Sequence, residues 1–99
     1  MISLKQIVGF DWDGGNSRKS ADKHDVSQAE GESIFFGDPL IVAEDSKHSE
    51  EERRFHALGQ TTQGRTLHVT FTLRENETLI RVISACDMNR KERQFYEQA

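Results

Sequence analysis

The chain has 99 residues, of which 34% are hydrophobic and 30% are charged, and its formal net charge is -4. A chain of this length has room for one hydrophobic core, so we expect a single domain over residues 1–99. The acidic balance disfavours a dedicated nucleic-acid-binding protein, which usually carries an overall basic charge or a basic face.

The N-terminal part of the chain predicts one strand and one or two short helices. Residues 8–12 have the composition of a strand, and the polar segment 13–24 is a candidate first helix. Ser27 and Glu30 have the spacing of a capping box, in which each side chain accepts a hydrogen bond from the other residue's backbone N–H. The helix that they open is expected to end at Gly37 and to turn two apolar side chains inward, Ile34 and Phe35.

After residue 39 the hydrophobic period changes from that of helices to that of strands. We expect strands over residues 40–43, 53–59, 66–73 and 79–85. In the third, Leu67, Val69, Phe71 and Leu73 alternate with polar residues, which indicates one buried face. The fourth is mostly apolar on both faces and is expected near the middle of the sheet.

A second capping box, from Asn89 to Glu92, predicts a C-terminal helix that ends near Gln98. A run of strands with helices at both ends is typical of the α+β class. We therefore predict a small antiparallel sheet of about four to five strands, flanked by one or two N-terminal helices and one C-terminal helix.

Cysteine and histidine usage predicts no metal site and no cofactor. Cys86 is the single cysteine, so neither an internal disulfide nor a multi-cysteine zinc site can form. No two histidines have the i, i+4 spacing of helical metal ligands. The chain lacks a signal-peptide pattern and an apolar run of ~20 residues, so we expect a cytoplasmic protein that does not act at a membrane.

Three groups of residues are candidates for chemistry. Arg81 lies among apolar residues of the last predicted strand, where strict alternation places it on one face with Leu79 and Ile83 and places Ile80, Val82 and Ser84 on the other. Its guanidinium is either paired in a salt bridge, with Glu52 or Glu92, or it binds a phosphate.

The second group lies on the C-terminal helix, where Arg93 and Tyr96 fall on one stripe with Asn89. They are either packing residues of an amphipathic helix or a pair that holds a phosphate and stacks on a base. The third is Lys23–His24, because histidine exchanges protons near neutral pH. His48, His56 and His68 are weaker candidates; His68 lies on the polar face of its strand, and we expect His56 on the same face of the sheet.

Together these side chains suit one reaction, in which a 2′-hydroxyl of RNA attacks the neighbouring phosphate. That reaction requires a base, an acid and cations for the charge that develops on phosphorus.

Several segments then follow in a recognisable order along the chain. They are Phe10-Asp11-Trp12-Asp13, residues 23–27, residues 36–40, residues 45–53, Gly59 with Gly64-Arg65, and Ile83-Ser84-Ala85 followed by Glu92-Arg93 and Tyr96-Glu97. This ordered series resembles the BrnT family, the toxin half of BrnT–BrnA type II toxin–antitoxin systems.

The resemblance implies a RelE-like fold and a metal-independent endoribonuclease that inhibits growth by cleaving RNA. It also implies neutralisation by BrnA, a ribbon-helix-helix antitoxin. Toxin and antitoxin would form a heterotetramer that binds promoter DNA and represses its own transcription.

The residues that match the family pattern are expected at the site. For catalysis they are Lys23, His24, Arg81, Arg93 and Tyr96; for RNA binding they are Arg53, Arg65 and Glu92. The resemblance assigns Arg81 and Arg93 to phosphate contacts, His24 to proton transfer and Tyr96 to stacking or proton donation.

Two departures from the family pattern define an alternative. Cys86 stands where the family usually has arginine, and Asn16 stands where it usually has lysine. The alternative is a catalytically weakened partner-binding module that acts with its antitoxin in autorepression. A nucleic-acid binder without cutting activity is a third hypothesis, which the acidic net charge disfavours.

Overall fold

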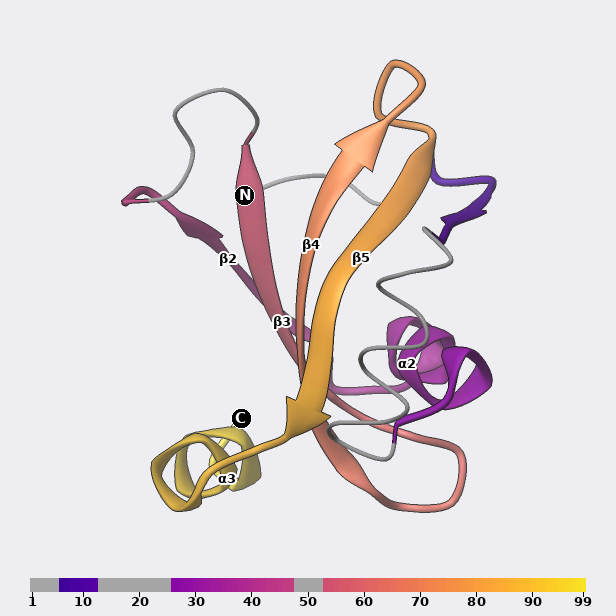
Figure 1. The fold of residues 1–99 in the computed structure, drawn as a ribbon. Helices are drawn as coiled ribbons and strands as arrows, with labels where there is room; N and C mark the ends of the chain where they lie inside the picture. The colour runs from indigo at the N-terminus through magenta and orange to yellow at the C-terminus, as the bar shows by residue number, and fades with distance from the viewer. Residues whose placement is uncertain (1–5, 13–25, 48–52) are drawn as a thin grey trace.

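The structure, a computed structural model, describes residues 6–12, 26–47 and 53–99. Within them the strands form one sheet in the order β1-β5-β4-β3-β2 (Figure 1). The strands are β1 (Gly9–Asp11), β2 (Ile41–Asp45), β3 (Arg54–Gln60), β4 (Thr66–Arg74) and β5 (Leu79–Asp87). The predicted α+β class and the predicted strands are confirmed.

The sheet is mixed rather than wholly antiparallel, which corrects one part of the prediction. Strands β2 to β5 pair antiparallel, whereas β1 pairs parallel to β5. A tight turn forces antiparallel pairing between the strands that it joins. No such turn joins β1 to β5, which are the first and the last strands of the chain, so their relative direction is not constrained in this way.

Helix α2 (Gln28–Ser33) and the 3-10 turn η1 (Ile34–Phe36) lie on one side of the sheet, and α3 (Arg90–Glu97) follows β5 on the other side (Figure 1). Both predicted capping boxes are confirmed. The candidate helix over 13–24 lies outside the described residues. No helix in the described ranges is long and apolar enough to cross a membrane.

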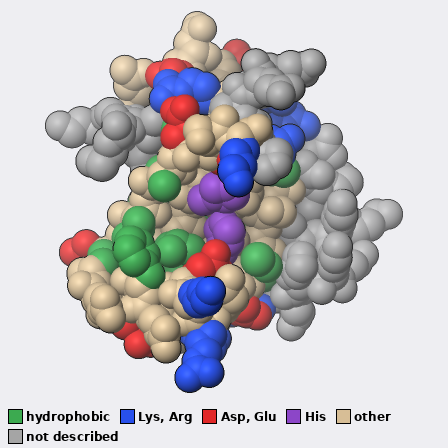
Figure 2. Space-filling model, turned by 90° about the vertical axis from the view of Figure 1, so that its left-hand side faces the viewer, with side chains coloured by type: hydrophobic (Ala, Val, Ile, Leu, Met, Phe, Trp, Pro, Cys, Tyr) green, Lys and Arg blue, Asp and Glu red, His purple; other side chains and the backbone are tan. Residues whose placement is uncertain are grey.

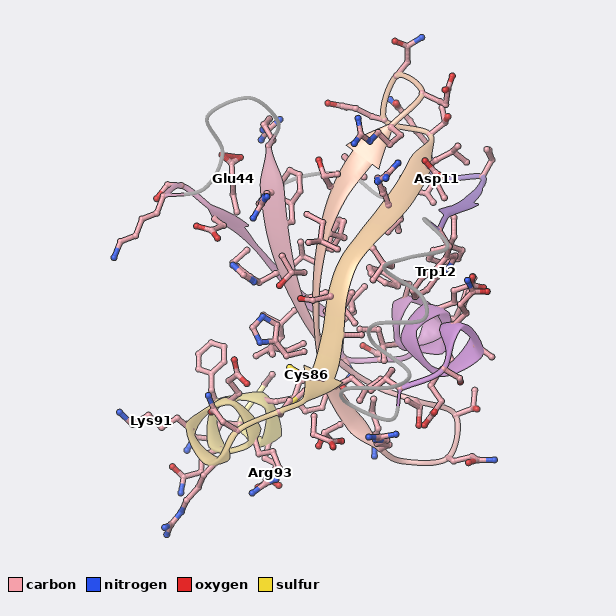
Figure 3. All side chains as sticks on the ribbon, viewed as in Figure 1. Asp11, Trp12, Glu44, Cys86, Lys91 and Arg93 are labelled. Atoms are coloured by element: carbon pink, nitrogen blue, oxygen red, sulfur yellow. The ribbon has the colours of Figure 1, made fainter. Side chains whose placement is uncertain are left out.

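The hydrophobic core lies between the sheet and the α2–η1 segment. Phe71 is fully buried at its centre, with ring centroids 5.4 Å from Phe55 and 5.3 Å from Phe35. Trp12, which follows β1, donates a hydrogen bond of 2.6 Å to Glu32 of α2 (Figure 3). These contacts cover one face of the sheet and leave its other face available for a site.

A bulge in β5 changes which side chains share a face. The β4–β5 register runs from Thr70 opposite Ser84 to Phe71 opposite Val82, so Ile83 is an extra residue in β5. The prediction that Ser84 shares a face with Ile80 and Val82 is therefore wrong. Instead, Ser84 lies on the face of Arg81, because the extra residue shifts the alternation by one position.

Candidate functional site

The sheet face that is turned away from α2 carries a concentration of polar side chains, and we call it the open face. Strand alternation and the register of the five strands assign residues to it. They are Asp11, Asp45, Arg54, His56, His68, Thr70, Thr72, Arg81, Ser84 and Cys86. Figure 2 looks onto this face and shows the histidines at its centre.

One cross-strand row of the open face runs through all the strands of the sheet. In order, Asp45, Arg54, Thr72, Arg81 and Asp11 occupy paired positions on β2, β3, β4, β5 and β1. Arg81 Nη1 lies 3.4 Å from Asp11 Oδ2, and the Arg81 side chain is 27% exposed. The row therefore places two guanidinium groups on one strip of the open face, with a carboxylate at each end.

Beside that row, four ionisable side chains form a continuous hydrogen-bonded chain. His56 Nε2 lies 2.9 Å from Asp45 Oδ2, and His56 Nδ1 lies 2.9 Å from His68 Nε2. His68 Nδ1 lies 2.9 Å from Glu92 Oε2, and His56 Nδ1 is also 3.1 Å from the hydroxyl of Thr70. The chain of contacts therefore crosses β2, β3 and β4 and ends on α3.

The electrostatic surroundings of His68 favour its neutral ring. Burial lowers the pKa of His68 below its ordinary value. The carboxylate of Glu92 acts in the opposite direction, and the charge of His56 lowers the pKa further. A neutral imidazole has one nitrogen that accepts a proton, so His68 has the form that a general base requires.

A hollow of ≈ 260 Å³ opens beside the two histidines. Both rings line it together with Glu92, and the rest of its wall is apolar: Ile41, Ala43, Leu58 and Phe95. Phe95 is 60% exposed, so its ring is accessible where it lines the hollow. Across the described ranges, no group of three or more His, Cys, Asp or Glu side chains is arranged to hold a metal ion.

The structure places the predicted site residues in different parts of the molecule. Arg81 lies on the open face and contacts Asp11, whereas Glu92 contacts His68. Glu52, the other predicted partner of Arg81, lies outside the described residues. Glu92 lines the hollow and also caps α3. Lys23 and His24 lie outside the described residues.

Arg53 and Arg65 are engaged away from the open face. Arg53 pairs with Glu44, Nη2 to Oε1 at 2.5 Å, and its guanidinium lies over the ring of Phe55. Arg65 binds Asp87 through two hydrogen bonds of 2.7 and 3.0 Å and binds Glu30 through one of 3.0 Å. These carboxylates raise the pKa of Arg65, so its contacts are those of a structural ion-pair cluster.

Tyr96 and Arg93 do not share one accessible stripe of α3. Tyr96 is 5% exposed, its hydroxyl donates a 2.6 Å hydrogen bond to the carbonyl of Pro39, and burial raises its pKa. This burial favours a packing role for Tyr96 over the predicted role in stacking or proton donation. Arg93 is exposed on the underside of α3, where Nη1 lies 3.4 Å from the carbonyl of Met88 (Figure 3).

Sequence reasoning missed Arg54 and the contact between His56 and His68. The two histidines lie 12 residues apart and meet because β3 and β4 pair in the register Leu58 to His68 and His56 to Thr70. The alternation of each strand predicted the face on which each histidine lies, but it did not predict the contact between the two rings. Cys86, where the resemblance implies an arginine, pairs with His68 across the β4–β5 ladder, and burial raises the pKa of its thiol.

The fold and the site define a small α+β domain with a sheet face that bears arginines and histidines. Residues 12–92 match the family described as the ribonuclease toxin, BrnT, of type II toxin–antitoxin systems. The chain therefore belongs to the BrnT family of ribonuclease toxins.

A solved structure supports the fold. The chain resembles the crystal structure of the Brucella abortus ribonuclease toxin BrnT, with a TM-score of 0.63 over 84% of this chain and 99% of that one. The two sequences are 18% identical over this match, so the likeness is one of fold. None of the curated protein sequences compared with the chain matches it.

Proposed function

We propose that this chain is an active, metal-independent endoribonuclease that inhibits growth by cutting RNA at its open face. The observation that carries the proposal is the row with Arg54 and Arg81 next to the histidines, in a member of a ribonuclease-toxin family. Guanidinium groups match the geometry of phosphate oxygens, and a positioned base and acid complete the requirements of 2′-hydroxyl attack.

Arg81 is the principal phosphate contact in this proposal. Asp11 orients the guanidinium of Arg81. Thr72 of β4 lies between Arg81 of β5 and Arg54 of β3 in the row. Charge-assisted contacts of this kind stabilise a developing phosphorane by ~2–4 kcal/mol each. Arg93 of α3, Lys23 and His24 belong to the set that the family resemblance implies.

The partner in this proposal is a BrnA-like antitoxin, because the family is defined by type II toxin–antitoxin systems. Toxin and antitoxin assemble as a heterotetramer that binds its own promoter DNA. Both act in the cytoplasm, where RNA is the substrate.

A second candidate function is a partner-binding module with little or no cutting activity. One observation favours it: Cys86 lies on the open face beside His68, and its thiol is not a cation. A lost charge-assisted contact to a transition-state phosphate lowers the rate by about a hundredfold or more.

Growth after tightly induced expression in bacteria distinguishes the two functions. We expect arrest that a co-expressed BrnA-like antitoxin relieves and that Arg81→Ala abolishes while the variant stays soluble. Normal growth with soluble wild-type protein that still binds the antitoxin would reject the active toxin and support the binding module.

A further inference from the structure

The chain of four ionisable side chains requires one more proton than two neutral rings provide. Three contacts of 2.9 Å link Asp45 to His56, His56 to His68 and His68 to Glu92, and each needs one hydrogen. Two neutral imidazoles supply one N–H each, and two carboxylates supply none. A third hydrogen, shared between the two rings or held on a carboxyl group, completes the three contacts.

The two rings differ in exposure and in the groups that they face. The His56 side chain is 36% exposed and faces Asp45 on β2, whereas His68 is 23% exposed and more strongly desolvated. His68 faces Glu92 from α3 and Cys86 from β5. One arrangement that satisfies all three contacts has the hydrogen of the ring–ring contact on His56 Nδ1, which donates it to the lone pair of His68 Nε2.

In that arrangement one ring carries the proton and the other ring a lone pair, and both rings line one hollow. The hollow of ≈ 260 Å³ has an apolar wall with Phe95 among its lining residues, which suits a nucleobase, and both histidine rings line it. Arg54, two residues before His56 on β3, lies on the same face at a strand distance of about 7 Å.

We propose that His68 and His56 are the general base and the general acid of RNA cleavage, with the nucleobase held in the hollow against Phe95. The inference rests on the proposed ribonuclease function. In-line attack puts the base and the acid on opposite sides of phosphorus, so in this proposal a bound phosphodiester separates the two rings and replaces their 2.9 Å contact.

The step balances without any further reactant. His68 Nε2 removes the 2′-hydroxyl proton, the 2′-oxygen forms a bond to phosphorus, and the bond from phosphorus to the 5′-oxygen breaks. His56 Nδ1 transfers its proton to the departing 5′-oxygen. The products are a 2′,3′-cyclic phosphate and a 5′-hydroxyl, and the pair again holds one additional proton.

The test measures the pH dependence of cleavage with substitutions that keep one hydrogen-bonding atom in place. His56→Asn keeps an amide near the Nδ1 position, and His68→Gln keeps one near Nε2. The substrates are a single-stranded RNA with all four bases and the same RNA with sulfur replacing the 5′-oxygen at the cleaved linkage. Phe36→Ser, at an 80% exposed position on the other side of the sheet, is the control.

We expect each histidine variant to cut the oxygen substrate about 10²–10⁴ times more slowly than wild type. His68→Gln loses the acidic limb of the pH profile, and His56→Asn loses the alkaline limb. A thiolate leaves without protonation, so the sulfur substrate restores cleavage by His56→Asn but not by His68→Gln. With wild-type protein, the sulfur substrate removes the alkaline limb of the pH profile. This measurement uses no variant, so it does not depend on whether a variant folds.

The outcomes separate this inference from the proposed function. Wild-type protein that cuts neither substrate would overturn both. If wild-type protein cuts RNA, and both histidine variants keep its rate and both limbs of its pH profile, the acid–base pair alone is overturned. An alkaline limb that persists on the sulfur substrate would reject His56 as the acid.

Discussion

At the residue scale, Arg53, just before β3, and Arg54, the first residue of β3, have different surroundings. Arg53 lies with Phe55 and pairs with Glu44, on the side of the sheet that packs against the core. Arg54 lies on the open face in the row that contains Arg81. Successive side chains of a strand point to opposite faces, so only Arg54 is directed toward the proposed RNA site.

The first prediction compares alanine at these two positions. Arg54→Ala is expected to lower kcat/KM for RNA cleavage by about 10- to 100-fold, which corresponds to ~1.5–3 kcal/mol for a lost hydrogen bond to a charged group. Arg53→Ala is the matched control and is expected to stay within about twofold of wild type. Equal losses in the two variants would contradict the assignment of faces.

The second prediction concerns Tyr96, whose hydroxyl donates to the carbonyl of Pro39. Tyr96→Phe removes this hydrogen bond and leaves the carbonyl without that donor, which is expected to lower the free energy of unfolding by about 1–2 kcal/mol. Urea unfolding measures this loss. RNA cleavage per folded molecule is expected to remain unchanged, and a large fall in cleavage would restore Tyr96 to the catalytic set.

At the element scale, local patterns predicted the elements well and their long-range pairing poorly. Ser27 and Asn89 are capping residues whose signal lies within four residues, and both were identified from sequence. The bulge at Ile83 leaves the hydrophobic pattern of β5 almost unchanged, so strict alternation gave Ser84 the wrong face. The contact of His56 with His68 depends on the register between two strands, which neither strand's pattern specifies.

The third prediction tests how the N-terminal segment packs on the sheet. A Cβ at Gly59 of β3 would lie 2.8 Å from Ile34 Cβ and 3.2 Å from the Ile34 carbonyl oxygen of η1. Gly59→Ala is therefore expected to destabilise the fold by ~1–3 kcal/mol through overpacking. Calorimetry should show a Tm lower by at least about 4 °C, and an unchanged Tm would mean that η1 does not pack closely on β3.

At the scale of the whole molecule, one ion-pair cluster joins three parts of the chain. Arg65, in the turn between β3 and β4, binds Glu30 of α2 and Asp87 at the end of β5. The backbone N–H of Ser27 and then the Arg65 side chain hold the pKa of Glu30 below its ordinary value of 4.5. The cluster thus connects the N-terminal helix to the sheet.

The fourth prediction follows from that lowered pKa. The folded state binds the Glu30 proton more weakly than the unfolded state does, so this carboxylate contributes stability above pH 4.5 and loses it as the pH falls through its folded pKa. Urea unfolding between pH 3 and 7 is expected to show this loss. Glu30→Gln should flatten the decline, whereas Glu97→Gln, at an exposed position of α3, should leave it steep.

The most direct test of the central claim, that the open face cuts RNA, is a cleavage assay with purified protein in the presence of a metal chelator. Wild-type protein is expected to cut single-stranded RNA and leave 2′,3′-cyclic phosphate ends. Arg81→Ala, shown to be folded by urea unfolding, is expected to be at least about a hundredfold slower. No cleavage by wild type, or undiminished cleavage by Arg81→Ala, would contradict the account.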